Sequence, residues 1–341
     1  MSTVAKLVRW EWFKLRRRWL PWILLGFLLL FSQMAVWIGF FSYNNLRTSG
    51  GQVLVSDAAQ APDSRGQFRR VSCITLRING SDAIPADSSP DVMQGLLAQC
   101  QQQSEQQETL LQQGYDGFTL PGSLLAAFGI ASSIGLILLT VLTASAIGSD
   151  YGLGTIRPIL ARGTGRLPYL TGKFLMLLAA ALGALGVVGA TTVLSSLIAV
   201  GIAQEPPGVA SEPSDWSEAA AAFVRTWASF IPYIAFTGMV SVLTRSAAAG
   251  MAVGLGYYFA ESLLGALLGG LFSWFSTVGD FLLIRNINAL AGGFDIGSSG
   301  GSSGSDIGLV QAAAALIVYT VMLTGIAIRF FQKRYVAGAS G

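Results

Sequence analysis

The sequence predicts an all-α polytopic membrane protein with six transmembrane helices, an N-terminal interfacial elbow helix and a small α/β ectodomain between the first two spans. Hydrophobic residues make up 52% of the 341 residues and charged residues only 11%, against about 25% charged residues in a typical soluble domain. Six apolar runs are long enough to cross a hydrocarbon core about 30 Å thick. Lysines and arginines gather on alternate short connections, which is the positive-inside pattern and places both termini in the cytoplasm.

The N-terminal segment, residues 1–19, is expected to form an amphipathic helix. Its apolar and aromatic side chains fall on one stripe, with lysines and arginines beside or opposite it. Such a helix suits the headgroup plane of the membrane lipid. Glu11 lies near the apolar stripe, and we interpret it as facing a protein partner, pairing with an arginine, or lying at a solvated helix end. No secretory signal is predicted, because the basic leader runs into an apolar stretch, 20–43, that is long enough to span.

The polar segment 44–120 is far longer than a typical connection of about 4–6 residues, and we expect it to be the ectodomain. Alternation over 71–78 predicts a strand, and 91–113 is expected to be a helix. Cys73 and Cys100 both lie in this segment. A single disulfide between them is expected if the segment faces an oxidising compartment, and two free thiols are the alternative.

Five further spans are predicted at 121–148, 171–203, 222–243, 247–271 and 308–331. The segments after them are, in order, an inner loop, an outer loop, a tight turn, an outer segment and an inner tail, at 149–170, 204–221, 244–246, 272–307 and 332–341. Asp280 and Arg285 interrupt the apolar part of 272–307, so this segment is expected to lie at the interface or to re-enter. Small residues spaced four apart indicate close helix packing, with a gating hinge as the alternative, at Gly250/Gly254, Gly265/Gly269 and Gly186/Ala190.

The basic island between the second and third spans runs from Asp150 to Lys173. Its centre predicts one short helix, because Thr155 can cap it, Pro158 falls in its first turn and Gly163 can end it. We expect this helix to lie beneath the membrane and to offer a protein partner an apolar face with a basic rim, formed by Ile156, Ile159, Leu160, Arg157, Arg162 and Arg166. An ordinary basic loop is the alternative.

This island resembles the coupling loop of ABC-2-type permeases in its acidic residue, its Gly-Thr step, its arginine and its final Gly-Lys, here Asp150, Gly154, Thr155, Arg166, Gly172 and Lys173. The segment 10–17 likewise resembles the elbow helix of that family. The resemblance implies the permease subunit of an ATP-driven exporter in a bacterial plasma membrane. It also implies a second permease copy, as a homodimer that forms the translocation path, and a separate ABC ATP-binding subunit that docks on the 150–173 loop and on Glu11.

No catalytic residue, metal site or cofactor is predicted on this chain, so ATP and magnesium are expected on the partner subunit. Gly172-Lys173 does not complete a nucleotide-binding loop, because Phe174 stands where Ser or Thr is required and Leu167 where the first Gly is required. The chain has no histidine, and two cysteines alone cannot build a zinc site. The basic clusters flank spans, so they do not indicate nucleic-acid binding.

Glu261 is the one carboxylate expected deep in a span, where a charge usually faces the bundle interior or a wet cavity. With Tyr257 and Tyr258 it is a candidate for the translocation path, or it has a structural role. This residue keeps open an alternative function, an autonomous secondary transporter or channel that uses Glu261. A third class, an intramembrane lipid-modifying enzyme, is disfavoured because the sequence has no histidine and no clustered acid–base pair.

Overall fold

The computed structural model describes residues 3–48, 58–62, 68–72, 102, 105, 108–152, 165–204, 213–268, 279–292 and 307–336. The chain divides into two compact units. The larger comprises Met1–Met34, Leu124–Ser195 and Ser211–Gly341, and the smaller comprises Ala35–Ser123 and Ser196–Ala210.

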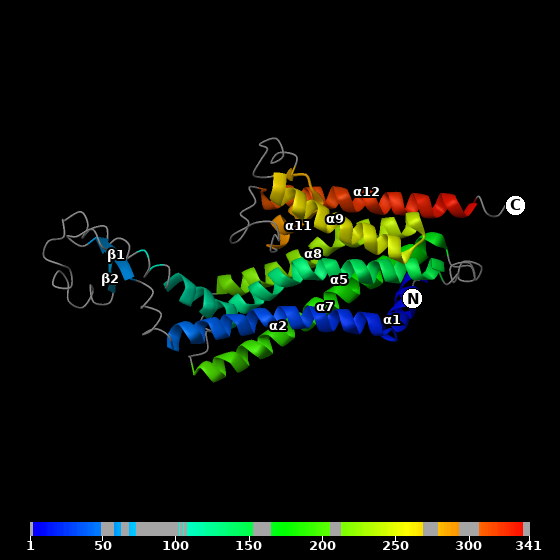
Figure 1. Cartoon of the computed structure of the whole chain (residues 1–341). Coiled ribbons are helices and arrows are strands. Elements are labelled where there is room, and N and C mark those ends of the chain that lie inside the picture. Colours follow the sequence, from blue (N-terminus) through cyan, green and yellow to red (C-terminus); the bar gives the residue numbers. More distant parts are fainter. Residues whose placement is uncertain are drawn as a thin grey trace. The chain divides into compact units, whose positions relative to one another are not determined.

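The described helices are α1 (Thr3–Arg16), α2 (Trp19–Thr48), α5 (Gly122–Gly152), α7 (Arg166–Ala203), α8 (Pro213–Thr244), α9 (Ala247–Leu268), α11 (Leu283–Ala291) and α12 (Leu309–Val336). Figure 1 shows α5, α8, α9 and α12 along one common direction, with α1 turned away from it. Five of these helices are long and apolar enough to cross a membrane, namely α2, α5, α7, α8 and α12. The protein is therefore a multi-pass helical membrane protein.

The predicted count of six spans is not confirmed. The predicted fifth span is helix α9, which is 22 residues long but is not among the five described helices that meet the criteria of length and composition. The predicted outer segment 272–307 contains α11, which at nine residues is too short to span, at about 1.5 Å of rise per residue.

Several helices extend beyond their predicted ends. Helix α5 continues to Gly152 and α7 begins at Arg166, so the predicted loop 149–170 is much shorter, and Asp150 lies on a helix. Helix α8 begins at Pro213 with Asp215 in its first turn, inside the predicted outer loop. Proline in a first turn and an acidic residue beside the helix N-terminus both favour a helix start there.

Glycines bring α9 close to its neighbours in the larger unit. A Cβ at Gly148 of α5 would lie 2.4 Å from the Cα of Ala247, the first residue of α9. A Cβ at Gly250 would lie 2.1 Å from Ser241 Oγ of α8, and one at Gly254 would lie 2.5 Å from a methyl group of Thr140 in α5. The predicted packing role of the Gly250/Gly254 pair is thus confirmed.

The other predicted pairs differ. A Cβ at Gly186 or Gly265 would meet nothing within 4 Å, so neither glycine marks a close helix contact among the residues that the structure describes. Gly269 lies outside the described residues.

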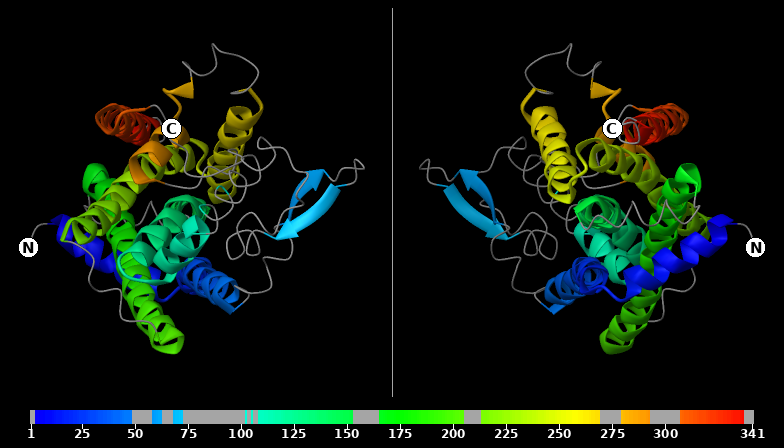
Figure 2. Two further views of the ribbon diagram at one scale, coloured as in Figure 1. Left: turned by 90° about the vertical axis from the view of Figure 1, so that its left-hand side faces the viewer. Right: turned by 90° about the vertical axis from the view of Figure 1, so that its right-hand side faces the viewer.

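Helices α1 and α2 are each held against α7 in the larger unit. Helix α1 crosses the start of α7 (Figure 2), where a Cβ at Gly172 would lie 3.3 Å from the Cβ of Leu7. Farther along, α2 is joined to α7 by side-chain hydrogen bonds. Gln33 Nε2 donates to Thr191 Oγ1 at 3.0 Å, and Ser195 Oγ donates to Gln33 Oε1 at 2.5 Å.

Aromatic side chains form the core of the smaller unit. Helical residues 108–118 pack against the second half of α2, where Phe118 contacts Phe40 and Tyr43 with ring centroids 5.8 and 5.3 Å apart. The end of α7 belongs to the same unit, since Ser196 and Ser123 share a hydrogen bond of 2.9 Å.

The smaller unit also holds a two-stranded antiparallel ladder of β1 (Ala58–Pro62) and β2 (Phe68–Ser72), with Ala58 opposite Ser72. Strand β2 overlaps only the start of the predicted strand 71–78. The predicted disulfide between Cys73 and Cys100 lies outside the described residues.

Candidate functional site

A cluster of charged side chains joins the last turn of α5 to the first turns of α7 and to α1. Asp150 of α5 is its centre, and its side chain is 0% exposed. Lys14 Nζ lies 2.6 Å from Asp150 Oδ1. The hydroxyl of Tyr169 donates to Asp150 Oδ2 at 2.6 Å, and Lys173 Nζ contacts the same oxygen. These residues and Glu11 are called the ionic cluster below.

Lys173 is as deeply buried as its partner, with a side chain only 1% exposed. Its Nζ donates to the carbonyl of Ala146 at 2.6 Å and lies 3.6 Å from Glu11 Oε2. It also lies 5.4 Å from the centroid of the Tyr169 ring. Two carboxylates thus face two ammonium groups, which is the balance that buried charges require.

Helical spacing explains why these side chains meet. Glu11 and Lys14 are three residues apart on α1, and Tyr169 and Lys173 are four residues apart on α7, so each pair shares a helix face. Asp150 lies in the last turn of α5, where the helix dipole disfavours a carboxylate. The two lysines compensate for that unfavourable position, so α5 depends on α1 and α7 to end where it does.

Two more contacts widen the junction. Arg18, just after α1, donates from Nη1 to Ser149 Oγ at 3.1 Å. The ring of Tyr169 stacks on Phe331 near the end of α12, with centroids 6.2 Å apart. The ionic cluster therefore lies where α1, α5, α7 and the end of α12 meet, at one end of the larger unit (Figure 1).

The predicted coupling residues fall into two groups. Gly154, Thr155, Ile156, Arg157, Ile159, Leu160 and Arg162 lie outside the described residues, and Arg166 is the first residue of α7. The structure brings Asp150, Lys173 and Glu11 together. All three are buried within the chain, and they join the helix ends on either side of residues 153–164; their coupling to a partner stays a prediction.

Sequence reasoning missed two members of the ionic cluster. They are Lys14 of α1 and Tyr169 of α7, neither of which the sequence pattern singles out. The available signal was their spacing, three residues after Glu11 and four residues before Lys173. Pairing with an arginine was one of three interpretations of Glu11, and the structure pairs it with Lys173 instead.

The family of this protein was identified by comparison with known proteins. A family model described as ABC-2 family transporter protein matches residues 5–336. The chain belongs to this family. The match covers the ionic cluster and every described span of this ABC-2 protein. No curated protein and no solved structure matches the chain.

The second predicted site of the ABC-2 protein centres on Glu261 in α9. Its side chain is buried, and Oε1 accepts a hydrogen bond of 2.9 Å from the backbone N–H of Arg285. Arg285 is the third residue of α11, whose N-cap, Leu282, provides no side-chain hydrogen bond. Glu261 therefore caps α11 from a neighbouring helix, and its negative charge suits the positive end of the α11 dipole.

Of the two tyrosines predicted beside Glu261, Tyr257 makes a side-chain hydrogen bond with that carboxylate. Tyr257 lies against Phe236 of α8, with ring centroids 4.9 Å apart. Tyr258 is 1% exposed and meets the edge of Phe259. Helix α11 packs on α8, α9 and α12, and Figure 2 shows it beside α12. Glu261 thus has a definite structural task in holding α11.

Replacing Glu261 with Leu should loosen α11, because the N–H groups of its first turn lose a buried acceptor. A lost buried hydrogen bond costs about 1–3 kcal/mol, so amide exchange over residues 283–287 should accelerate about tenfold or more. Hydrogen exchange followed by mass spectrometry measures this. Glu261→Gln keeps an acceptor of nearly the same shape and is the matched control. Unchanged exchange in Glu261→Leu would show that α11 does not depend on this cap.

Proposed function

We propose that this chain is the membrane-spanning permease subunit of an ATP-driven ABC exporter. In this proposal two copies form the translocation path, and each is coupled to a separate ATP-binding subunit through residues 150–173. The ATP-binding subunit holds the nucleotide and magnesium. The assembly lies in a bacterial plasma membrane with the N- and C-termini of this chain in the cytoplasm.

The ionic cluster is the observation that carries the proposal. It ties both ends of the loop, Asp150 and Tyr169/Lys173, to the interfacial helix α1. A displacement of the loop would therefore move α5, α7 and α1 together. Separating these helices would break buried ion pairs, which is costly, so they move as one rigid body. If the two ends of the loop were not joined in this way, the loop backbone would deform and the helices would not move with it.

The proposed topology is supported by the position of the chain ends in the larger unit. Phe331 of α12 stacks on Tyr169, which belongs to the same cluster as Glu11 of α1. Two ends on one side of a membrane require an even number of crossings. With five clear spans, α9 supplies the sixth, since 22 residues rise about 33 Å as a helix.

A dimeric assembly is supported by how little of the outer helices the chain itself covers. In the apolar windows of α2, α7 and α12, 22%, 28% and 17% of the residues are buried, against 61% and 67% in α5 and α8. In a membrane such faces are covered by lipid or by a second copy of the chain. A translocation path between two copies requires that at least one of these faces forms the interface.

The test is co-purification. A tagged chain extracted from its native membrane should bring an ATP-binding subunit with it, and the complex should release phosphate from ATP. Reversing two loop charges, Arg157→Glu with Arg162→Glu, should weaken retention of that subunit about tenfold or more, because like charges across an interface are costly. Glu218→Lys, an exposed charge reversal on the first turns of α8, is the control and should leave retention unchanged.

Two results would contradict the proposal. One is transport by the isolated chain in vesicles without any ATP-binding subunit, which would favour the secondary transporter or channel. The other is labelling of the 153–164 segment from the outside of intact cells. Glu261 caps α11, which gives this residue a structural role that does not require transport. An autonomous transporter that uses Glu261 is therefore only the second candidate.

A further inference from the structure

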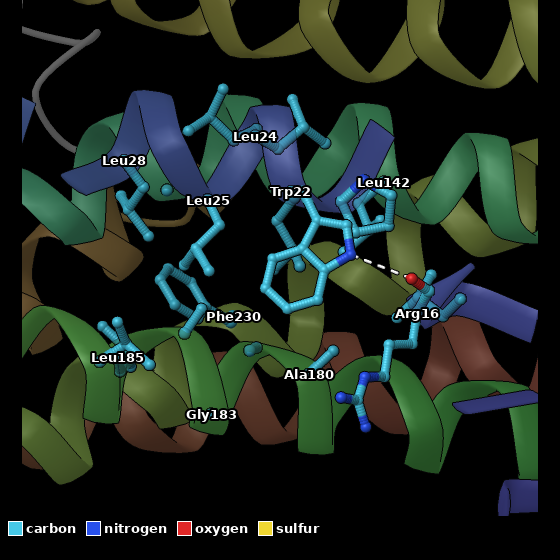
Figure 3. A pocket seen from close by; sticks show the side chains of 18 of the residues that line it. Arg16, Trp22, Leu24, Leu25, Leu28, Leu142, Ala180, Gly183, Leu185 and Phe230 are labelled. Carbon is cyan, nitrogen blue, oxygen red and sulfur yellow. Dashed lines mark hydrogen bonds between the residues drawn. The ribbon is translucent and has the colours of Figure 1, made fainter. Parts of the chain in front are cut away.

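A cavity of about 410 Å³ lies in the larger unit between α1, α2, α5 and α7. Figure 3 shows Leu24, Leu25 and Leu28 of α2 on one wall, Ala180 and Gly183 of α7 on the opposite wall, and Phe230 between them. The room exists because α7 carries small residues where α2 faces it. The volume is within the range of about 300–1,000 Å³ that is usual for small-molecule sites.

The cavity is apolar along its length and polar at one end. Almost all of its lining is hydrocarbon, and among the described residues that border it Arg16 is the one with a charge. At that end Trp22 Nε1 donates to the backbone carbonyl of Arg16 at 3.0 Å (Figure 3), and Trp12 also lines the wall. Tryptophan rings prefer the headgroup level of a membrane, so the polar end of the cavity lies at that level.

Arg16 differs from the basic residues around it. Lys14 pairs with Asp150, Arg17 lies 5.0 Å from the centroid of the Phe13 ring, and Arg18 bonds Ser149. The Arg16 guanidinium is exposed and makes no ion pair or side-chain hydrogen bond within the described part of the chain. A guanidinium beside an apolar cavity suits a ligand with a phosphate at one end, because it can donate two parallel hydrogen bonds to phosphate oxygens.

We propose that this cavity binds one acyl chain of an anionic phospholipid from the leaflet that holds α1, with the phosphate at Arg16. Two of its walls, α2 and α7, are spans that the chain leaves largely uncovered, so a lipid reaches the cavity sideways from the bilayer. A spanning helix of a second copy does not fit, because a helix about 10 Å across needs roughly 400 Å³ for each turn and the cavity has room for about one turn. The site is independent of the transport function proposed above.

Photolabelling of the full-length chain in vesicles tests the proposal. The vesicles contain equal parts of phosphatidylglycerol and phosphatidylcholine, and the probe is phosphatidylglycerol with a diazirine on one acyl chain. Mass spectrometry of the digested protein should place the label in residues 24–28 and 180–187 in excess over the exposed face of α12. Equal labelling of all lipid-exposed helices, or crosslinks from these residues to a second protein copy, would overturn the site.

Filling the cavity provides a specific control. A Cβ at Gly183 meets nothing within 4 Å, so Gly183→Leu extends into the cavity without a backbone clash. Label in the two segments should fall about tenfold, the loss expected when roughly two methylene groups are displaced. Gly186→Leu is the same change on the same helix, also in open space; Gly186 is not itself a lining residue, although its neighbours Leu185 and Val187 are, and this variant should keep the label. Equal labelling of both variants would refute the proposed occupant.

The headgroup is tested separately. In the unaltered chain the phosphatidylglycerol probe should label the two segments more than a phosphatidylcholine probe of the same acyl composition. Arg16→Gln should remove this preference, whereas Arg9→Gln, on the same helix but not at the cavity, should retain it. Equal labelling by both probes in the unaltered chain would overturn the role of Arg16. Melting temperatures of all variants confirm that each is folded before it is labelled.

Discussion

Replacing Asp150 with Asn should destabilise the protein by about 3–5 kcal/mol, the usual cost of breaking a buried ion pair from one side. The substitution keeps the shape of the side chain but leaves the Lys173 ammonium buried beside Ala146 with only Glu11, 3.6 Å away, as a counter-charge. Lys14 is 29% exposed and can turn to solvent, so most of the cost falls on Lys173. Thermal unfolding of the purified chain in detergent measures the loss.

A double-mutant cycle separates the charge from the shape. Lys173→Met in the Asp150→Asn background removes the stranded ammonium, and the charges that remain, Glu11 and Lys14, are opposite in sign on one face of α1. The double variant should therefore recover much of the lost stability, with a coupling energy well above about 0.5 kcal/mol. Additive losses would show that Asp150 and Lys173 stabilise the protein independently.

Replacing Gly148 with Ala should destabilise the protein by about 1–3 kcal/mol or more, the usual cost of overpacking a well-packed contact. The new methyl group would lie 2.4 Å from both the backbone nitrogen and the Cα of Ala247. Because these are backbone atoms, no side-chain rotation relieves the contact, and α5 must move away from the start of α9. Asp150 lies two residues further along α5, so the same shift should loosen the ionic cluster.

The matched control for Gly148→Ala is Gly256→Ala in α9, where the added Cβ meets nothing within 4 Å. Alanine is the better helix former by about 1 kcal/mol, so this variant should be neutral or slightly more stable. The two substitutions are chemically identical and should change the melting temperature in opposite directions. A similar change in both would mean that helix propensity, and not the contact with Ala247, sets the effect.

The membrane-spanning character was predictable because it depends on local composition. Each apolar run is by itself long enough to cross the bilayer. The spans α2, α5, α7, α8 and α12 can therefore be predicted from their own sequence, without knowing which helices pack beside them. Helix ends were less predictable. Asp150 is charged, which favoured placing it in a loop, but it remains helical because lysines from two other helices pair with it.

At the candidate site, too, some features were predictable from sequence and others were not. Sequence singled out Asp150, Lys173 and Glu11 as residues of interest but assigned them to a docking surface. Their contacts join residues that are 136 and 19 positions apart along the chain, as for Lys14 with Asp150 and Tyr169 with Asp150. No periodicity within one helix reports such distances, so their burial was not foreseeable from pattern.

The sequence by itself determined that this chain crosses a membrane several times, which family it resembles, and where the basic segment between two spans lies. These properties depend on the hydropathy and charge of neighbouring residues, which the order of amino acids states directly. Only the tertiary structure decided that Asp150 and Lys173 are buried together, that Glu261 caps α11, and that small residues of α7 leave a cavity beside α2. Each of these depends on which helix faces which, and helices choose their neighbours through shape and charge that become complementary only after packing.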